Sequence, residues 1–582
     1  MKKIIIKFFN FFLHNENTLS RVLILSIVLV SPALISGFFS DDIYFLNRLS
    51  GNTIMPAKPE FTLYGLFSIT PGGEQVKNEM VNQGLLPWWT SNNFRFQMWR
   101  PLAELSHAID FKLFGSFAFP MHIENIMWWC AILWLAYSIY SKLFRLNPTL
   151  ASICFIFYAL DGSYAQTISW IASRNTLMAM FFSLASLLNF INGAHRSQLL
   201  SKYWIFASVL YAIGLSCSEF SIGILPFILL YPFMTPEHSL FKKAVSVIPF
   251  ILFTLAWVYI YKTYHYGVSG SEHYLDPTSD PIKFMSSLLE LLPTFVFKQF
   301  FVFQPQLLGA YTFLNWNWLL SILILGIIGY CTKEYLSSKL GIYLTVAAII
   351  AIIPISASTG GPRLIGFVSL GLTPILAVIA LKLINETKSI VVMYSGGMLL
   401  LLHVLSLLAF PLIPVLMMRN AINLIEKPAR TLTFVPDKEV ILINPYQVAF
   451  SALFPIERAN KGDYLPPHLY TLMTGDKKIR VIKRDDKTYD FVPETIVLSA
   501  PEDFFFRTKK EAFYDNEEFN YPTILISVHT NKLNEAEYLT LKLLKDAAEY
   551  QFVYCHDSNW GTLDLTKQKI GESTELGLCS MN

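Results

Sequence analysis

Long apolar runs separated by short polar segments dominate the first 420 residues of this chain. A helix needs about 20 mostly apolar residues to cross the hydrocarbon core of a bilayer. The runs that meet or approach this length predict eleven spans: 22–39, 125–144, 149–168, 175–193, 203–218, 220–234, 244–262, 316–332, 340–356, 364–383 and 390–416. The pattern therefore predicts an α-helical polytopic membrane protein.

The pattern changes after residue 420. Residues 421–582 hold 19 of the 45 Lys and Arg and 24 of the 42 Asp and Glu. Strand-like runs and one helical periodicity predict a small soluble α/β domain there. The strands are expected at 439–444, 478–482, 494–500, 523–528 and 551–555, and the helix at 533–549.

Composition excludes two classes of protein. With 53% hydrophobic and 15% charged residues, the chain is neither an ordinary soluble protein nor a disordered one. Its net charge of +3 indicates no nucleic-acid partner.

Basic residues predict the orientation in the membrane, because cytoplasmic segments carry an excess of Lys and Arg. With the N-terminus inside, every inner segment has at least two basic residues: Lys2, Lys3, Lys7 and Arg21, then Lys142/Arg145, Arg196/Lys202, Lys242/Lys243, Lys333/Lys339 and Lys382/Lys388. The expected organisation is a cytoplasmic interfacial segment (1–21), a transmembrane body (22–420) and an extracytoplasmic domain (421–582). The protein is then expected to be a multi-pass membrane protein.

The outer segments 40–124 and 263–315 are long, whereas all inner loops are short, so the chemistry is expected outside. Residues 102–114 have the spacing of an amphipathic helix on the outer surface. His107 and His265 are expected at the surface or interface, and the pairs Trp88-Trp89 and Trp128-Trp129 in an interfacial belt.

Six Cys occur without a CxxC pair, which excludes a zinc ribbon and a dense disulfide framework. Cys555 and Cys579 are the only Cys of the outer domain. An oxidising compartment allows them to form a disulfide, and the sequence leaves open whether they do.

The most informative local feature is the pair Asp41-Asp42 directly after the first span. Two carboxylates where a helix leaves the bilayer are costly unless they are solvated, paired or functional. Taken alone, such a pair is better explained as a solvated loop end with a helix-terminating Asp.

Further motifs fall on the predicted outer face: Trp99-Arg100-Pro101-Leu102, Asp110-Phe111, Leu113-Phe114-Gly115, His122-Ile123-Glu124-Asn125, Ser169 to Asn175 around Arg174, Ser218-Glu219, and Gly361-Pro362-Arg363. Each Arg alone is also explained by snorkelling or by pairing with a nearby carboxylate. The common sidedness of the motifs favours a functional site.

The order of these motifs resembles the multi-spanning glycosyltransferases of the GT-C fold, in the protein O-mannosyltransferase-like and TPR-containing O-mannosyltransferase-like branch. The resemblance covers roughly residues 1–420, and no TPR repeats follow. The chain departs from the family pattern at Asp161-Gly162, Ser218-Glu219 and Arg363-Leu364, which leaves the donor sugar and the acceptor open.

The resemblance implies an inverting transferase that moves a sugar from a polyprenyl-phosphate donor to an envelope acceptor. Asp41 is then the general base, with Asp42 orienting it or binding the acceptor. Crowding and desolvation are expected to raise one pKa of this pair. Arg363 and Arg174, and less directly Arg100, are expected to bind the lipid phosphate.

His122, Glu219 and Asn125 are expected to contact the acceptor or a metal. The family requires no cofactor, but Asp41, Asp42, Glu219 and His122 have the donor atoms to hold Mg²⁺ or Mn²⁺. Two other classes of function remain: a transporter or flippase for a polyprenyl-linked glycan, and a non-catalytic membrane scaffold. The transporter is disfavoured because no broken-helix Gly/Pro pair recurs in two halves of the sequence.

Overall fold

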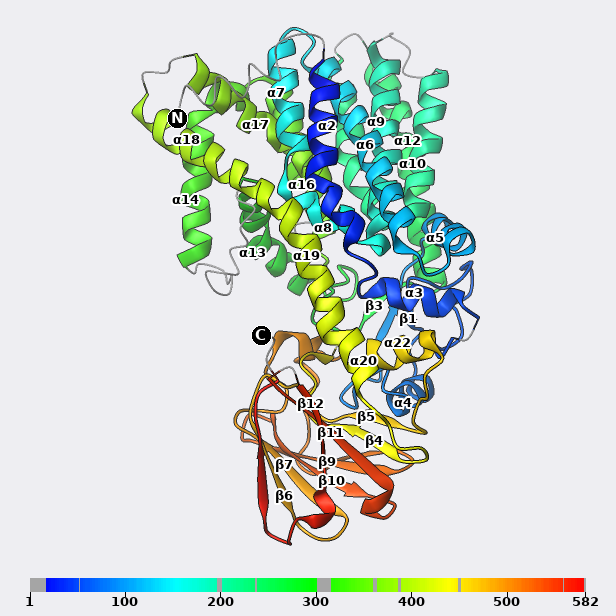
Figure 1. Ribbon diagram of the computed structural model, residues 1–582. Helices are drawn as coiled ribbons and strands as arrows, with labels where there is room; N and C mark the ends of the chain where they lie inside the picture. Colours follow the sequence, from blue (N-terminus) through cyan, green and yellow to red (C-terminus); the bar gives the residue numbers. More distant parts are fainter. Residues whose placement is uncertain are drawn as a thin grey trace. The chain divides into compact units, whose positions relative to one another are not determined.

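The computed structural model describes residues 17–51, 53–195, 201–235, 238–300, 316–358, 364–385, 389–448, 452–557 and 559–579. The chain divides into two compact units (Figure 1). Residues 1–37, 99–265 and 276–416 form one, called here the helical unit. Residues 38–98, 266–275 and 417–582 form the other, called the β-rich unit.

The helical unit is a bundle in which α9 packs against both α6 and α10 (Figure 1). Its main helices are α2 (Thr18–Val30), α5 (Pro101–Phe114), α6 (Ala118–Leu143), α7 (Pro148–Ala159), α8 (Ala165–Ser169), α9 (Arg174–His195), α10 (Lys202–Cys217), α11 (Leu225–Leu230), α12 (Leu240–Thr263), α13 (Pro281–Phe300), α14 (Trp316–Cys331), α15 (Lys333–Leu336), α16 (Lys339–Ile355), α17 (Gly366–Ile384), α18 (Ile390–Leu405) and the start of α19 (Ala409–Ala421).

Among the described residues, six helical stretches are long and apolar enough to cross a membrane: Thr18–Ile35, Ala118–Leu143, Ile171–Ala194, Leu240–Thr263, Gly366–Ile384 and Ile390–Thr431. Four shorter apolar helices accompany them: Lys202–Cys217, Glu219–Met234, Trp318–Cys331 and Lys339–Ile355. The helical unit is therefore that of a membrane protein, but the predicted count of eleven spans is not confirmed.

Three of the predicted spans are unbroken helices that are shorter than a full crossing, and two others are irregular. The predicted span 149–168 stops after Ala159, turns at Asp161 and continues as a 3₁₀ turn (Gly162–Tyr164) and α8. The predicted span 220–234 consists of short pieces that begin near Pro226 and Pro232. Proline lacks the backbone N–H of a regular helix, so these pieces do not merge into one.

Helices in the bundle begin where the sequence supplies a cap. Asn147 accepts a hydrogen bond from the backbone N–H of Leu150, and Pro148 occupies the first turn of α7. Ser239, Ser338 and Ser389 cap α12, α16 and α18 in the same way. Each cap satisfies a backbone donor that the helix itself leaves unpaired.

The β-rich unit contains three sheets. β1 (Ser68–Thr70), β2 (Arg95–Gln97) and β3 (Gly267–Ser269) form a small antiparallel sheet from the two predicted outer segments. A six-stranded sheet has the order β13 (Ser573–Leu576), β6 (Ile479–Lys483), β7 (Thr488–Pro493), β10 (Ala536–Leu543), β9 (Ile524–Thr530) and β8 (Glu517–Asn520). A four-stranded sheet has the order β12 (Asn559–Leu563), β11 (Tyr550–His556), β4 (Glu439–Leu442) and β5 (Leu469–Thr471), with β4 parallel to β11 and β5.

The helices of the β-rich unit are few: α3 (Asp41–Leu49), α4 (Glu74–Asn82), α20 (Lys427–Thr431) and α22 (Leu453–Lys461). The predicted helix over 533–549 is wrong, because Ala536–Leu543 alternates buried and exposed side chains as strand β10. The predicted strand over 494–500 is also absent from the described chain. The C-terminal region is therefore richer in β-sheet than expected.

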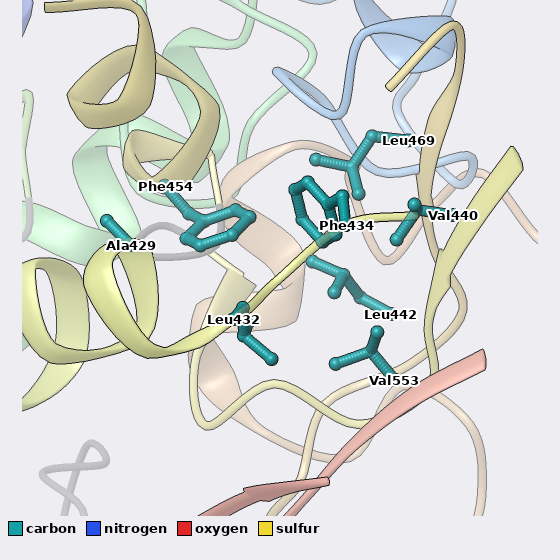
Figure 2. Packing of buried hydrophobic residues seen from close by; sticks show 8 residues of the cluster. All are labelled: Ala429, Leu432, Phe434, Val440, Leu442, Phe454, Leu469 and Val553. Carbon is teal, nitrogen blue, oxygen red and sulfur yellow. The ribbon is translucent and has the colours of Figure 1, made fainter. Parts of the chain in front are cut away.

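A hydrophobic cluster in the C-terminal region contains residues that are far apart in the sequence, from Ala429 to Val553 (Figure 2). Its members are Ala429, Leu432, Phe434, Val440, Leu442, Phe454, Leu469 and Val553, with Trp560 packed against them. Helices α20 and α22 thus share a core with the four-stranded sheet.

The segment 38–98 is part of the same unit, which the charge pattern did not indicate. Trp88 and Trp89 are 1% and 0% exposed, so the predicted interfacial position of this pair is wrong. Their indole N–H groups donate to the backbone carbonyls of Leu472 (2.8 Å) and Asp503 (3.1 Å). A buried indole removes roughly 150–250 Å² from water, so this segment contributes substantially to the core.

Cys555 and Cys579 form a disulfide that links β11 to the C-terminal segment. Disulfides form and persist mainly in oxidising compartments. The open question about this cysteine pair is thereby answered for the folded chain.

Residues 430–582 produced alone should unfold at a lower urea concentration than the same residues linked to 38–98, because the contacts of Trp88 and Trp89 are lost. Urea titrations followed by circular dichroism measure the difference. The linked protein with Trp88→Ala is the control, and its unfolding midpoint should fall most of the way back to that of residues 430–582 alone. Equal midpoints for all three proteins would contradict the assignment of 38–98 to this unit.

Candidate functional site

Asp41 and Asp42 open α3 in the β-rich unit, and the structure gives them different environments. Asp42 is 3% exposed and its Oδ2 accepts a hydrogen bond from the backbone N–H of Phe39 at 2.9 Å. Asp41 is exposed, and the Ser40 hydroxyl donates to its Oδ1 at 3.3 Å. The predicted desolvation of the pair therefore applies to Asp42 alone.

The turn that presents Asp41 is unusual in its backbone. Ser40 has a φ of 51°, a left-handed conformation that is uncommon outside glycine. The Asp42–Phe39 hydrogen bond closes this turn, and both carboxylates lie in the first turn of α3. The partial positive charge at a helix N-terminus stabilises carboxylates there.

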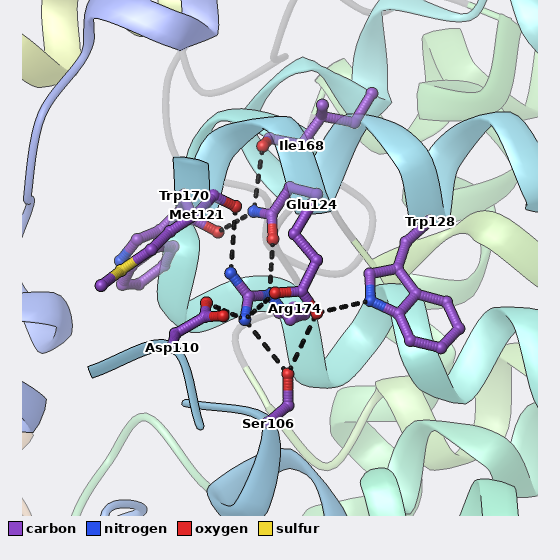
Figure 3. A network of polar contacts seen from close by, with 9 residues as sticks. Ser106, Asp110, Met121, Glu124, Trp128, Ile168, Trp170 and Arg174 are labelled. Carbon is purple, nitrogen blue, oxygen red and sulfur yellow. Dashed lines mark hydrogen bonds and ion pairs between the residues drawn. The ribbon is translucent and has the colours of Figure 1, made fainter. Parts of the chain in front are cut away.

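Arg174 is the centre of a polar network in the helical unit (Figure 3). Its side chain is 0% exposed, and its Nη1 forms ion pairs with Asp110 and, at 2.8 Å, with Glu124. Nη2 donates to the carbonyl of Met121 at 3.0 Å, and Nε donates to Asn125 Oδ1 at 2.9 Å. Each nitrogen of this buried guanidinium thus has a protein partner, and the predicted role of Arg174 in binding the lipid phosphate stays a prediction.

Ser106 and Trp128 complete the network around Glu124. The Ser106 hydroxyl and the Trp128 indole N–H donate to Glu124 Oε1 at 3.2 Å and 3.1 Å. Arg174 also donates to Ser106 at 3.1 Å. The network therefore ties α5, α6 and the start of α9 together.

Two carboxylates share this one guanidinium. Burial raises the pKa of Asp110 to about 7, and the neighbouring Glu124 acts in the same direction, while Arg174 opposes the shift. A carboxyl group with a pKa near neutral pH can gain or lose a proton under working conditions. Asp110 is therefore a chemically competent residue that the predicted site omitted, although it lies in one of its motifs.

Asn125 orients the network from a second direction. Its amide Nδ2 donates to the carbonyls of Ile168 and Trp170 at 3.2 Å and 3.1 Å, while its Oδ1 accepts from Arg174. The first carbonyl belongs to α8, and the second lies between α8 and the 3₁₀ turn before α9. Asn125 is fully buried and holds this part of the chain, and its predicted contact with an acceptor or a metal stays a prediction.

Arg100 and Glu219, predicted separately, form an ion pair at the start of α5. Arg100 Nε donates to Glu219 Oε2 at 3.0 Å, and Nη2 bonds to Oε1. The two side chains are 16% and 32% exposed, unlike the buried Arg174. A partly exposed arginine can exchange its carboxylate partner for another anion more easily than a buried one.

His122 is fully buried in α6. Its Nε2 lies 3.3 Å from the Ser36 hydroxyl and 3.0 Å from the carbonyl of Gly37, at the end of the first apolar stretch. His122 therefore fixes the exit of this stretch. His107 is also buried, at 4% exposed, so its predicted surface position is wrong.

The structure thus brings Arg174 together with Asn125, and Arg100 together with Glu219. Arg363 lies outside the described residues. Among the residues that the structure does describe, no group of three or more His, Cys, Asp or Glu is placed to hold a metal. The divalent cation stays a prediction.

No protein-family model and no curated protein matches this chain. Among solved structures, the chain is similar to the crystal structure of ArnT from Cupriavidus metallidurans bound to undecaprenyl phosphate, with a TM-score of 0.37 and 11% sequence identity. The similarity covers 78% of this chain and 90% of that chain. At this TM-score the function has to rest on the chain's own residues.

Arg174→Ala should destabilise the protein strongly, because removing one partner of a buried ion pair typically costs about 3–5 kcal/mol. The midpoint of thermal unfolding in detergent measures this loss. Asp110→Asn added to Arg174→Ala should restore part of the stability, since it removes one uncompensated carboxylate. The exposed Arg145→Ala is the matched control and should leave the midpoint unchanged. An unchanged midpoint for Arg174→Ala would show that the network contributes nothing to folding.

Proposed function

We propose that the chain is a membrane glycosyltransferase that moves a sugar from a polyprenyl-phosphate donor to a hydroxyl acceptor at the outer face of the cytoplasmic membrane. One observation carries the proposal: the exposed carboxylate of Asp41 stands on a turn that the buried carboxylate of Asp42 closes. Two adjacent acids with such different surroundings have different tasks. This division of tasks is what a positioned general base requires.

In the proposed reaction, the acceptor hydroxyl oxygen attacks the anomeric carbon of the donor while the bond from that carbon to the phosphate oxygen breaks. Asp41 takes the hydroxyl proton, and polyprenyl phosphate leaves with its charge. A single displacement of this kind inverts the anomeric centre. Asp42 acts as a positioning residue through the Phe39 turn.

The leaving phosphate needs cationic partners, and Arg offers a planar fork of donors. Arg100 is the better candidate of the two described arginines, because a phosphate can replace Glu219 as its partner. We assign Arg174 to the scaffold, since it is buried between Asp110 and Glu124. Arg363 keeps its predicted role in binding the phosphate, and no divalent cation is required.

The proposed orientation has the N-terminus inside and the C-terminal region outside. The disulfide between Cys555 and Cys579 supports it, since the cytoplasm keeps thiols reduced. The partners are then the bilayer, the lipid-linked donor and an envelope acceptor. Mass spectrometry of envelope glycans from cells with and without this chain would identify the sugar and the acceptor.

Asp41→Asn should lower turnover by roughly 10²–10⁴-fold, the usual contribution of general-base catalysis, while the melting temperature stays unchanged. Transfer from a radiolabelled polyprenyl-phosphate sugar by purified protein measures it. The exposed Asp486→Asn is the matched control. If sugar transfer by Asp41→Asn equals that of the wild type, Asp41 is not the general base and the mechanism is overturned. A transporter or a scaffold would not depend on Asp41 for its function.

A periplasmic reporter fused after residue 420 should be active, and one placed within 333–339 should be inactive, if the orientation is as proposed. Thiol labelling of intact cells gives a second readout. Cys555→Ser should free Cys579 for a membrane-impermeant maleimide. The reverse pattern of reporter activity would place the C-terminal region in the cytoplasm and remove the outer-face site.

A further inference from the structure

A second ionisable centre lies in the helical unit, at the break between α7 and α8. Asp161 is 0% exposed. The twelve residues of α7 rise about 18 Å, while the hydrocarbon core is about 30 Å thick. By this length Asp161 lies within the apolar layer, where an ionisable residue is expensive and usually functional.

Asp161 is held by neutral groups from three separate segments. Its Oδ1 accepts from the backbone N–H and the hydroxyl of Ser163 at 3.0 Å and 2.6 Å. Its Oδ2 lies 2.9 Å from Gln299 Nε2 and 3.3 Å from Ser369 Oγ. Gln299 lies on α13 and Ser369 on α17, and both are fully buried.

The side chains of Asp161, Gln299 and Ser369 form a closed ring of contacts, and counting its hydrogen atoms shows which contacts are satisfied. Ser369 Oγ is also 2.7 Å from Gln299 Oε1, so three contacts connect Asp161, Gln299 and Ser369. Gln299 Nε2 supplies one hydrogen and the Ser369 hydroxyl supplies one, which it donates to the nearer Gln299 oxygen. The third contact, between Ser369 Oγ and Asp161 Oδ2 at 3.3 Å, then has no hydrogen of its own, so the ring can accommodate one more hydrogen or another monovalent cation.

The same atoms form a set of hard oxygen donors. A carboxylate, a hydroxyl and, after rotation of the amide group, the Gln299 carbonyl oxygen suit a small monovalent ion in place of the proton. The assignment of amide oxygen and nitrogen follows the hydrogen-bond network and can reverse with it. One carboxylate balances the charge of one monovalent ion, which favours a monovalent over a divalent cation in this ring.

The backbone around the ring is irregular in two places that touch each other: the turn after α7, and the 3₁₀ turn Ser406–Leu408 within the helical stretch Ile390–Thr431. Helix α18 ends at Leu405, and the Gly162 N–H lies 3.3 Å from the Ser406 hydroxyl. A Cβ added to Gly162 would come within 2.0 Å of the Ser406 carbonyl oxygen, so the two breaks are in direct backbone contact. Broken helices with a buried carboxylate are a recurrent way to bind H⁺ or Na⁺ inside membrane proteins.

We propose that Asp161, Gln299 and Ser369 form an intramembrane binding site for one monovalent cation, H⁺ or Na⁺. The proposal is independent of the transferase reaction. Other titratable groups face Asp161: His403 from α18, and Tyr158 and Tyr164 from α7 and the following turn. His403 Nε2 lies 3.3 Å from the carbonyl of Phe157, so this ring nitrogen contacts the backbone and not Asp161.

The test uses the full-length protein in detergent with choline as the only other cation. Infrared difference spectra between low and high pH should show the carbonyl stretch of a protonated buried carboxyl group, and Asp161→Asn should lose this band. In His403→Gln the band should remain. If Na⁺ is the ligand, NaCl should raise the thermal unfolding midpoint of the wild type more than choline chloride does. The required Na⁺ concentration should fall about tenfold per unit of rising pH, because the two ions compete.

Ser369→Ala keeps the carboxylate and removes one oxygen of the ring, so it carries the test if Asp161→Asn does not fold. It should abolish the Na⁺ response or shift the pH midpoint of the carboxyl band. Ser186→Ala, which removes a buried hydroxyl bonded to the carbonyl of Ala207, is the matched control and should change neither. An Asp161 carboxylate that stays ionised over the whole pH range, together with no specific Na⁺ effect, would overturn the proposal.

Discussion

The helical unit depends on the burial of one guanidinium. Arg174 stands at the first residue of α9, and its partners come from α5 and from α6. Such a cation is tolerated in an apolar bundle only because carboxylates and carbonyls surround it. The position of α5 is therefore fixed by polar contacts on its inner side rather than by apolar packing.

This constraint explains which parts of the structure the sequence could predict. Apolar runs such as Ala118–Leu143 and Leu240–Thr263 are long and uninterrupted, so their helices follow from periodicity and length alone. Asp161 and Pro226 interrupt shorter runs, and hydropathy cannot distinguish a crossing from a pair of half-helices at such positions. The number of spans was uncertain for this reason.

The candidate site likewise has features that the sequence could predict and features that it could not. Asp41, Asp42, Arg100 and Arg174 could be selected from the sequence because charges beside apolar runs are rare. Their environments could not be predicted from the sequence, because each depends on a partner far along the chain. Arg174 depends on Asp110, and Arg100 depends on Glu219. Trp88 likewise satisfies its indole with the carbonyl of Leu472, a pairing across 384 residues that no local pattern announces.

Helix α5 has a consequence for how the protein can be handled. Its inner face is charged, with Glu104 and Asp110 buried, whereas Leu105, Ile109 and Leu113 on the outer face are 40%, 50% and 67% exposed. A soluble helix has the opposite arrangement, so water cannot replace lipid around α5. The protein consequently requires an amphiphile along this helix as well as around its spans, and delipidation would expose an apolar stripe directly over the residues that hold Arg174.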